Sequence, residues 1–342
     1  MELTWTSILP LVFMAVMGLA LLAYVILDGY DLGVGILLPF ATDAEKDIMV
    51  SSIGPFWDAN ETWLVLGIGV LLIAFPLAHG IVLSALYLPV AVMLIGLILR
   101  GVSFDFRVKA RAARKHLWNR LFWLGSLMAA MAQGWMLGSY LTGFDHGLWS
   151  LLFSLGIAVT LPTAYCMLGA GWLIMKTWDD LQLKAVGWAR TALWPMGLAL
   201  VGISLATPMV SQNVFDRWFA MPQIIGLLPI PVACAVAFFA ALQVVSKPKA
   251  IAAGYGWVVF ASTVLIFVLS FLGLAYSIYP YIVVDRLTVW QAAAAHESLV
   301  FIFVGVAITL PAIIVYTIFM YRVFWGRASA LSYGLANDGM TE

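Results

Sequence analysis

The chain has 342 residues, of which 64% are hydrophobic and only 10% are charged, and its formal net charge is zero. A soluble domain carries about 25% charged residues, so this composition excludes a protein that is surrounded by water on all sides. The zero net charge removes the electrostatic basis for binding nucleic acid or an acidic surface.

Apolar segments long enough to cross a bilayer recur along the whole chain, since a membrane-spanning helix needs about 20 such residues. The sequence predicts an all-α polytopic membrane protein with about nine transmembrane helices, forming one membrane domain over residues 1–342 with a short polar tail at 328–342. No cleavable signal peptide is evident, so the first span is expected to stay in the mature protein. The predicted spans are 7–38, 54–77, 80–105, 120–141, 149–175, 188–209, 222–245, 256–279 and 298–324, with a tight turn expected between Pro76 and Gly80.

Lys and Arg residues in the loops predict the orientation, because cytoplasmic loops carry an excess of them. Alternate loops divide these residues 14 to 2, with Arg217 and Arg286 on the poorer side and Arg100 inside the third span. The N-terminus is therefore expected in the periplasm and the C-terminus in the cytoplasm of a bacterial inner-membrane protein. The richer side holds Lys46, Arg107, Lys109, Arg111, Arg114, Lys115, Arg120, Lys176, Lys184, Arg190, Lys247, Lys249, Arg322 and Arg327.

The first span contains two acids, where lipid normally excludes charge. Asp28 and Asp31 are three residues apart, so a helix places both on one face. Two carboxylates in a low-dielectric site suit proton holding or cation binding. Gly29, Gly33 and Gly35 would let a neighbouring helix approach closely. The alternative is that both acids lie at the wetted end of the span, although apolar residues follow them.

A second pair of acids, Asp58 and Glu61, shares a face at the start of the second span, between Trp57 and Trp63. One interpretation is an interfacial anchor, in which the tryptophans belong to an aromatic belt and the acids favour the helix N-terminus. The other is a functional site. The run Trp-Asp-Ala-Asn-Glu-Thr-Trp is unusually rich in hydrogen-bonding groups for a plain anchor, which favours function.

The third span carries Arg100 about one turn inside its expected end, with Ser103 and Asp105 nearby. Two arrangements are open at this point. Arg100 either pairs with one of the intramembrane carboxylates, or extends its side chain toward the cytoplasm.

The chain offers few ligands for a heme or a metal. Its four histidines, His79, His116, His146 and His296, form no i, i+3 or i, i+4 pair and no HExxH or CxxCH motif. Its two cysteines lie far apart in apolar segments, which is typical of small buried hydrophobic residues. The sequence therefore predicts that this chain binds no cofactor and no metal.

Several motifs together resemble subunit II of the cytochrome bd-type quinol oxidases, and they run from the first span to the last. The resemblance does not separate the cyanide-sensitive from the cyanide-insensitive members. It implies a terminal oxidase that oxidises a membrane quinol and reduces dioxygen to water. The hemes b and d would lie on a larger subunit I, with this chain as its heme-free partner of similar nine-helix build. The matching segments are Asp28 to Gly35, Gly54 to Leu64, Arg100 to Arg107, Tyr279 to Val283 and Tyr321 to Phe324.

The resemblance also implies that protons for dioxygen reduction come from the cytoplasm, partly along the subunit interface. The aspartate of the family's Trp-Asp motif, here Asp58, is assigned to that route. The expected proton pathway therefore ranks Asp58 first and Asp28 second, with Asp31 and Glu61 lower. A membrane-embedded carboxylate can relay protons if water reaches it and its pKa lies near the working pH.

The remaining expectations concern structural residues and partners. Arg100, Asp105 and Trp57 are expected to be structural, the first two through an ion pair at the cytoplasmic end. The expected partners are the heme-bearing subunit I, membrane lipids and a membrane quinol bound at the partner, with a small accessory subunit left open. A proton- or cation-coupled secondary transporter is the alternative function, although such proteins often show internal repeats and none is visible here. A third possibility is a purely structural subunit whose acids serve assembly.

Overall fold

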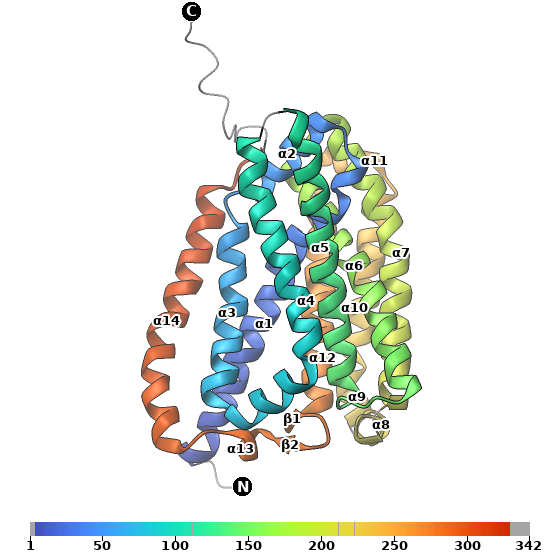
Figure 1. The fold of residues 1–342 in the computed structure, drawn as a ribbon. Coiled ribbons are helices and arrows are strands. Elements are labelled where there is room, and N and C mark those ends of the chain that lie inside the picture. The colour runs from blue at the N-terminus through green and yellow to red at the C-terminus, as the bar shows by residue number, and fades with distance from the viewer. Residues whose placement is uncertain (1–3, 111, 211, 222, 329–342) are drawn as a thin grey trace, which may run out of the picture.

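The computed structural model describes residues 4–110, 112–210, 212–221 and 223–328, and it is a bundle of long helices (Figure 1). In this part of the chain, nine helical segments are long and apolar enough to cross a membrane. The predicted all-α membrane architecture is thereby confirmed. The predicted tail at 328–342 lies outside the described residues except for residue 328. The long helices are α1 (Trp5–Leu37), α3 (Trp57–Ala74), α4 (Pro76–Lys109), α5 (Ala112–Leu141), α6 (Leu148–Lys176), α7 (Asp179–Val210), α10 (Pro229–Val245), α12 (Trp257–Ile278) and α14 (His296–Val323).

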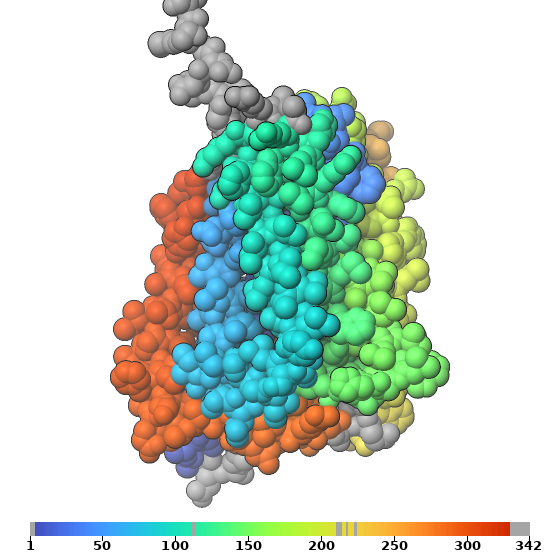
Figure 2. Space-filling view, viewed as in Figure 1, coloured from blue at the N-terminus to red at the C-terminus, as the bar shows by residue number. Residues whose placement is uncertain are grey.

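Shorter elements join the spans at the two ends of the bundle. One end, where α1 begins, carries a small antiparallel hairpin beneath α3 and α4 (Figures 1 and 2). The other end carries an additional helix directly after the first span. These elements are η1 (Leu38–Phe40), α2 (Asp43–Ile53), α8 (Gln212–Phe219), α9 (Gln223–Leu227), α11 (Pro248–Ala250), η2 (Ile251–Tyr255), β1 (Tyr281–Val283), β2 (Leu287–Thr288) and α13 (Val289–Ala292).

The turn between the second and third spans is shorter than predicted. Only Phe75 interrupts the helices, and α4 already begins at Pro76, so the expected turn residues up to Gly80 are helical. The physical reason is that proline suits the first position of a helix, where its missing N–H costs nothing, and it pushes the preceding residue out of the helical region. A second proline, Pro229, begins α10 and separates it from α9 inside the seventh predicted span.

Helix α2 was not predicted, because it is too polar and too short for a span. Thr42 caps its N-terminus by accepting a hydrogen bond from the backbone of Glu45, whose carboxylate in turn accepts from the backbone N–H of Thr42. Met49, Val50 and Ile53 are buried. The helix therefore lies on the bundle with one apolar face and exposes Asp43 and Asp47. Helix α7 also begins earlier than predicted, at Asp179, because its first turns are polar and precede the apolar stretch of the sixth span.

Helix α1 lies inside the bundle and packs against α3, α5 and α6, whereas α14 lies at one edge beside α1 and α3 (Figure 1). A side chain at Gly33 would overlap the backbone carbonyl of Tyr165, and one at Gly169 would lie 2.5 Å from the backbone carbon of Gly33. The backbones of α1 and α6 are thus in contact, which confirms the close approach predicted from the glycines of the first span.

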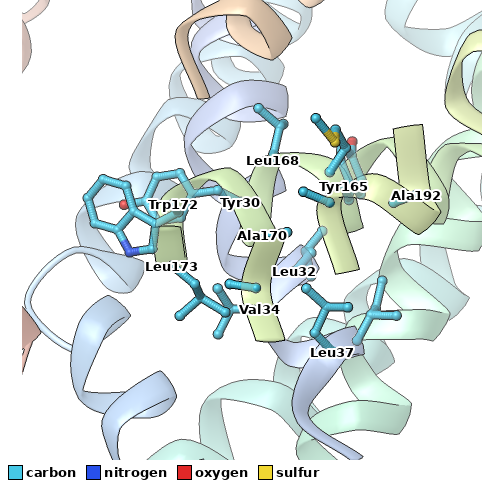
Figure 3. Packing of buried hydrophobic residues seen from close by; sticks show 14 of the residues in the cluster. Tyr30, Leu32, Val34, Leu37, Tyr165, Leu168, Ala170, Trp172, Leu173 and Ala192 are labelled. Carbon is cyan, nitrogen blue, oxygen red and sulfur yellow. The ribbon is translucent and has the colours of Figure 1, made fainter. Parts of the chain in front are cut away.

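The main core lies between α1 and α6, in the half of the bundle that also contains α2. Figure 3 shows its packing, in which Val34 of α1 lies beside Leu173 of α6. The rings of Tyr30 and Trp172 stack with centroids 4.3 Å apart. Large aromatic side chains thus hold the two central helices in a fixed register at this level.

The end of α14 is fastened to this core by a buried lysine. Lys176, at the end of α6, has 7% of its surface exposed and donates hydrogen bonds to the backbone oxygens of Phe324, Trp325 and Gly326. Its ammonium group also lies 4.9 Å from the centre of the Trp172 ring. A cation near the end of a helix satisfies carbonyl groups that have no partner within the helix itself.

Candidate functional site

Acidic side chains from two helices converge on one buried arginine. Arg100 of α4 and Asp28 of α1 each have 1% of their side-chain surface exposed, and the guanidinium Nη1 lies 2.6 Å from Asp28 Oδ1. Arg100 Nη2 also donates a hydrogen bond to Glu61 of α3. Of the two arrangements left open for Arg100, the structure shows pairing with intramembrane carboxylates. Burying one ion without its partner would be strongly unfavourable, so these three side chains fix α1, α3 and α4 to each other.

Asp31 lies one helical turn from Asp28 and has a different set of contacts. Its Oδ2 accepts a hydrogen bond of 2.8 Å from the Asn60 side-chain amide. The same amide nitrogen donates to Tyr30 Oη at 2.9 Å, and Tyr30 Oη lies 2.6 Å from Tyr321 Oη of α14. Asn60 is therefore the centre of a hydrogen-bond network that joins α1, α3 and α14.

The exposure of the acids increases in one direction along the site. Asp28 and Asp31 have 1% and 0% of their surface exposed, and the Glu61 side chain has 28% exposed. Asp58, one turn before Glu61 on α3, is exposed at the helix start. The four predicted acids thus lie together, and they extend from the surface of this chain to its interior.

Trp57 and Asp105, which were predicted to be structural, have different surroundings. Trp57 packs against Phe104 of α4, with ring centroids 5.2 Å apart. Asp105 is exposed, and within the part of the chain that the structure describes it forms no ion pair with Arg100. The reason is geometric: residues five apart on a helix point to nearly opposite sides. The expected ion pair between Arg100 and Asp105 is therefore wrong, and Arg100 turns inward instead.

A further polar chain leads from this region toward α5 and α6. Gln133 of α5 donates a hydrogen bond of 2.9 Å to Tyr24 Oη and accepts one from Tyr165 of α6. Tyr24 precedes Asp28 by one helical turn on α1. Sequence reasoning missed Asn60 and Gln133 as site residues. A polar amide within an apolar span is the signal that points to both of them.

Ion pairs hold α2 against the end of the bundle. Asp47 accepts from Arg107 of α4 at 2.6 Å, and Glu45 accepts from Lys184 of α7 at 2.8 Å. Burial alone would raise the pKa of Glu45, but the hydrogen bonds from Lys184 and Thr42 outweigh it and lower the pKa of this carboxyl. Helix α2 thus lies next to the start of α3 and is held there by ion pairs with α4 and α7.

The histidines lie near helix ends rather than in the middle of the spans. His79 and His296 lie in the first turns of α4 and α14, while His116 is near the start of α5 and His146 is in the loop after it. Within the described part of the chain, no group of three or more His, Cys, Asp or Glu residues has a geometry that could hold a metal ion.

Comparison with known proteins identifies the family. The family described as cytochrome bd terminal oxidase subunit II matches residues 9–324, nearly the whole chain. The chain belongs to this family. It is thus a subunit of a cytochrome bd quinol oxidase, an oxidoreductase complex of the respiratory chain, and a multi-pass protein of the bacterial inner membrane.

Individual relatives agree with this assignment over almost their full length. The chain is 28% identical to cytochrome bd ubiquinol oxidase subunit 2 of Bacillus subtilis (strain 168), over 89% of this chain and 92% of the relative. It is 24% identical to cytochrome bd-I ubiquinol oxidase subunit 2 of Escherichia coli (strain K12), over 94% and 95%. The fold resembles a chain in the structure of bd oxidase from Geobacillus thermodenitrificans, with a TM-score of 0.76 and 18% identity over 92% of this chain and 98% of that chain.

Proposed function

We propose that this chain is the heme-free subunit II of its oxidase, that it assembles with a heme-bearing subunit I, and that it contributes to the delivery of protons from the cytoplasm. The increase in exposure from Asp31 through Glu61 to Asp58 supports this proposal most directly. A proton taken up at the surface can move inward along a series of carboxyl groups. The lipid-facing side of a helix normally carries no such groups.

The proposed direction of proton entry rests on the loop charges. The basic residues that predict the cytoplasmic side, including Arg107, Lys115 and Lys184, lie at the end of the bundle that contains α2 and the start of α3. Asp58 is at this end. If this end faces the cytoplasm, as we propose, Asp58 is the point of entry, and Asp28, Asp31 and Glu61 form the inner part of the site.

The hemes b and d are proposed to lie on the partner subunit, where they would carry out electron transfer and bind dioxygen. Residues of this chain would bind neither heme. Their contribution would be to hold protons close to the subunit interface and to keep lipid away from that path. The transporter alternative has no supporting observation, since the chain belongs to an oxidase family along nearly its whole length.

Replacing Asp58 tests the proposed entry point. The Asp58→Asn variant keeps the size of the side chain but can no longer take up and release a proton. We expect the assembled complex to retain its heme absorption spectrum while quinol-dependent oxygen consumption falls by about tenfold or more, the range over which positioned proton-transfer groups act.

The matched control is Asp105→Asn, which removes an exposed acid at the same end of the bundle that forms no ion pair within the described residues. This variant is expected to retain the oxygen consumption of the unmodified complex. Equal rates for both variants, with normal proton uptake, would contradict the role of Asp58.

A further inference from the structure

The charges of the buried site do not balance if every acid is ionised. Asp28, Asp31 and Glu61 would contribute three negative charges, and Arg100 is the one cation in contact with any of them among the described residues. Two excess negative charges within membrane-spanning helices would be strongly unfavourable, because neither lipid nor packed side chains solvate them. At least one of the three acids must therefore hold a proton.

Asp28 is the acid least suited to hold it. Its Oδ1 lies 2.6 Å from Arg100 Nη1, and both side chains are 1% exposed. Arg100 cannot release its proton in a protein, so a neutral Asp28 would leave the guanidinium without its one fully buried counter-ion. Glu61 also contacts Arg100, and its 28% exposure gives its carboxylate partial solvation. Both of these acids therefore have a reason to be ionised.

Asp31 has neither of these advantages. It is completely buried, and among the described residues no lysine or arginine nitrogen lies within ion-pairing distance of its carboxyl group. Its Oδ2 accepts from the neutral amide of Asn60, and its Oδ1 has no hydrogen-bond partner in the described protein. The nearby hydroxyls, those of Tyr30 and Tyr321, bond to each other and to Asn60. Asp31 therefore has no neighbouring cation to balance an ionised carboxylate, which favours the neutral acid.

We propose that Asp31 is the proton-holding acid of the site and that Asp28 is a permanently ionised positioning residue that serves as the counter-ion of Arg100. The two aspartates of one helical face would then have opposite roles. When Asp31 releases its proton toward the partner subunit, it becomes a carboxylate that still accepts the hydrogen bond from the Asn60 amide. A proton that arrives by way of Glu61 then restores the neutral acid. This last step rests on the proposed proton-delivery function.

The two roles predict different consequences for the same substitution. Asn has the shape of a neutral aspartic acid, so Asp31→Asn is expected to give an assembled complex with the full heme spectrum and at least a tenfold loss of oxygen consumption. Asp28→Asn is expected to reduce assembly strongly, because Arg100 then keeps only the partly exposed Glu61 as its counter-ion. The double variant Asp28→Asn/Arg100→Gln removes both charges, and we expect it to recover assembly. Assembly of Asp28→Asn at the level of Asp31→Asn would overturn the proposal.

Infrared spectroscopy of the complex tests the proton directly, and its first measurement uses the unmodified complex. Labelling the aspartates with carbon-13 should shift a carbonyl band of a protonated carboxylic acid in the unmodified complex. In Asp31→Asn this band should be missing, whereas the control Glu61→Gln should keep it. Absence of an aspartic acid band from the unmodified complex would overturn the proposal. Loss of the band in Asp31→Asn with normal oxygen consumption would support the proton-holding role and would instead contradict the delivery function.

Discussion

At the scale of single residues, the site is organised by one cation and one amide. Arg100 contacts Asp28 and Glu61, whereas Asn60 contacts Asp31 and two tyrosines, so the two aspartates have different partners although they are one turn apart. The amide has two donor hydrogens and one carbonyl oxygen, and every one of these atoms has a neighbour within hydrogen-bonding distance. Removing it would leave buried partners unsatisfied on two helices.

The Asn60→Ala substitution should therefore destabilise the protein. We expect a loss of about 1–3 kcal/mol, the usual cost of leaving a buried polar group without its partner. Thermal unfolding of the complex, followed by heme absorption, measures this loss. Thr62→Ala, at an exposed position two residues along α3, is the control and should change the midpoint little. Similar midpoints for both variants would rule out a central role for Asn60.

The residue scale also shows what the sequence could and could not predict about the site. Charged residues stand out in apolar spans, so Asp28, Asp31, Glu61 and Arg100 are recognisable from the sequence alone. Which of these acids pair with Arg100 was not predictable, since its partners lie 72 and 39 positions earlier in the chain. Tyr321 belongs to a recognised motif, but its contact with Tyr30 joins residues 291 positions apart. Local sequence patterns carry no information about such distant neighbours.

At the scale of elements, the long spans were predictable because about twenty consecutive apolar residues have few other solutions. Helix α2 was not, since its stability comes from contacts with other helices. Glu45 pairs with Lys184 of α7, and Asp47 pairs with Arg107 of α4. The start of α7 was predicted late because its first turns are polar, and Lys184 in this part pairs with Glu45 of α2.

The attachment of α2 should depend on pH. The pKa of Glu45 is lower in the folded protein than its ordinary value of 4.5, so its stabilising contribution is present above that value and disappears as the pH falls through the lower folded pKa. We expect hydrogen-exchange protection of α2, relative to α1, to decrease below about pH 4. Glu45→Gln should show reduced protection of α2 already at neutral pH, with a weaker dependence on acid.

The control for this prediction is Asp145→Asn at the opposite end of the bundle. Hydrogen bonds from Ser150 and from the backbone of Gly147 also lower the pKa of Asp145, but this residue does not touch α2. Its replacement should leave the protection of α2 unchanged. A pH-independent α2 in the unmodified protein would show that its apolar face alone holds it in place.

At the scale of the whole molecule, membership of the oxidase family and the position of the histidines lead to a spectroscopic prediction. The complex purified through a tag on this chain should show heme b and heme d absorption, because subunit I accompanies it. The chain purified without subunit I should show none, and replacing His79, His146 or His296 should leave the heme spectrum of the complex unchanged. A heme spectrum in the isolated chain would contradict the proposed division of cofactors.

The fastening of α14 has a consequence for how the protein is made. Lys176 is synthesised about 150 residues before the backbone oxygens of Phe324, Trp325 and Gly326 that it binds, and Tyr321 completes the Asn60 network from the same turn. Until the last span is inserted, the ammonium group of Lys176 lacks these carbonyl acceptors, and the side-chain carbonyl oxygen of Asn60 lacks its hydrogen-bond donor. Insertion of the final helix therefore completes the polar contacts of the bundle. A chain that lacks α14 has unpaired polar groups within the membrane, and these groups become paired only when α14 is in place.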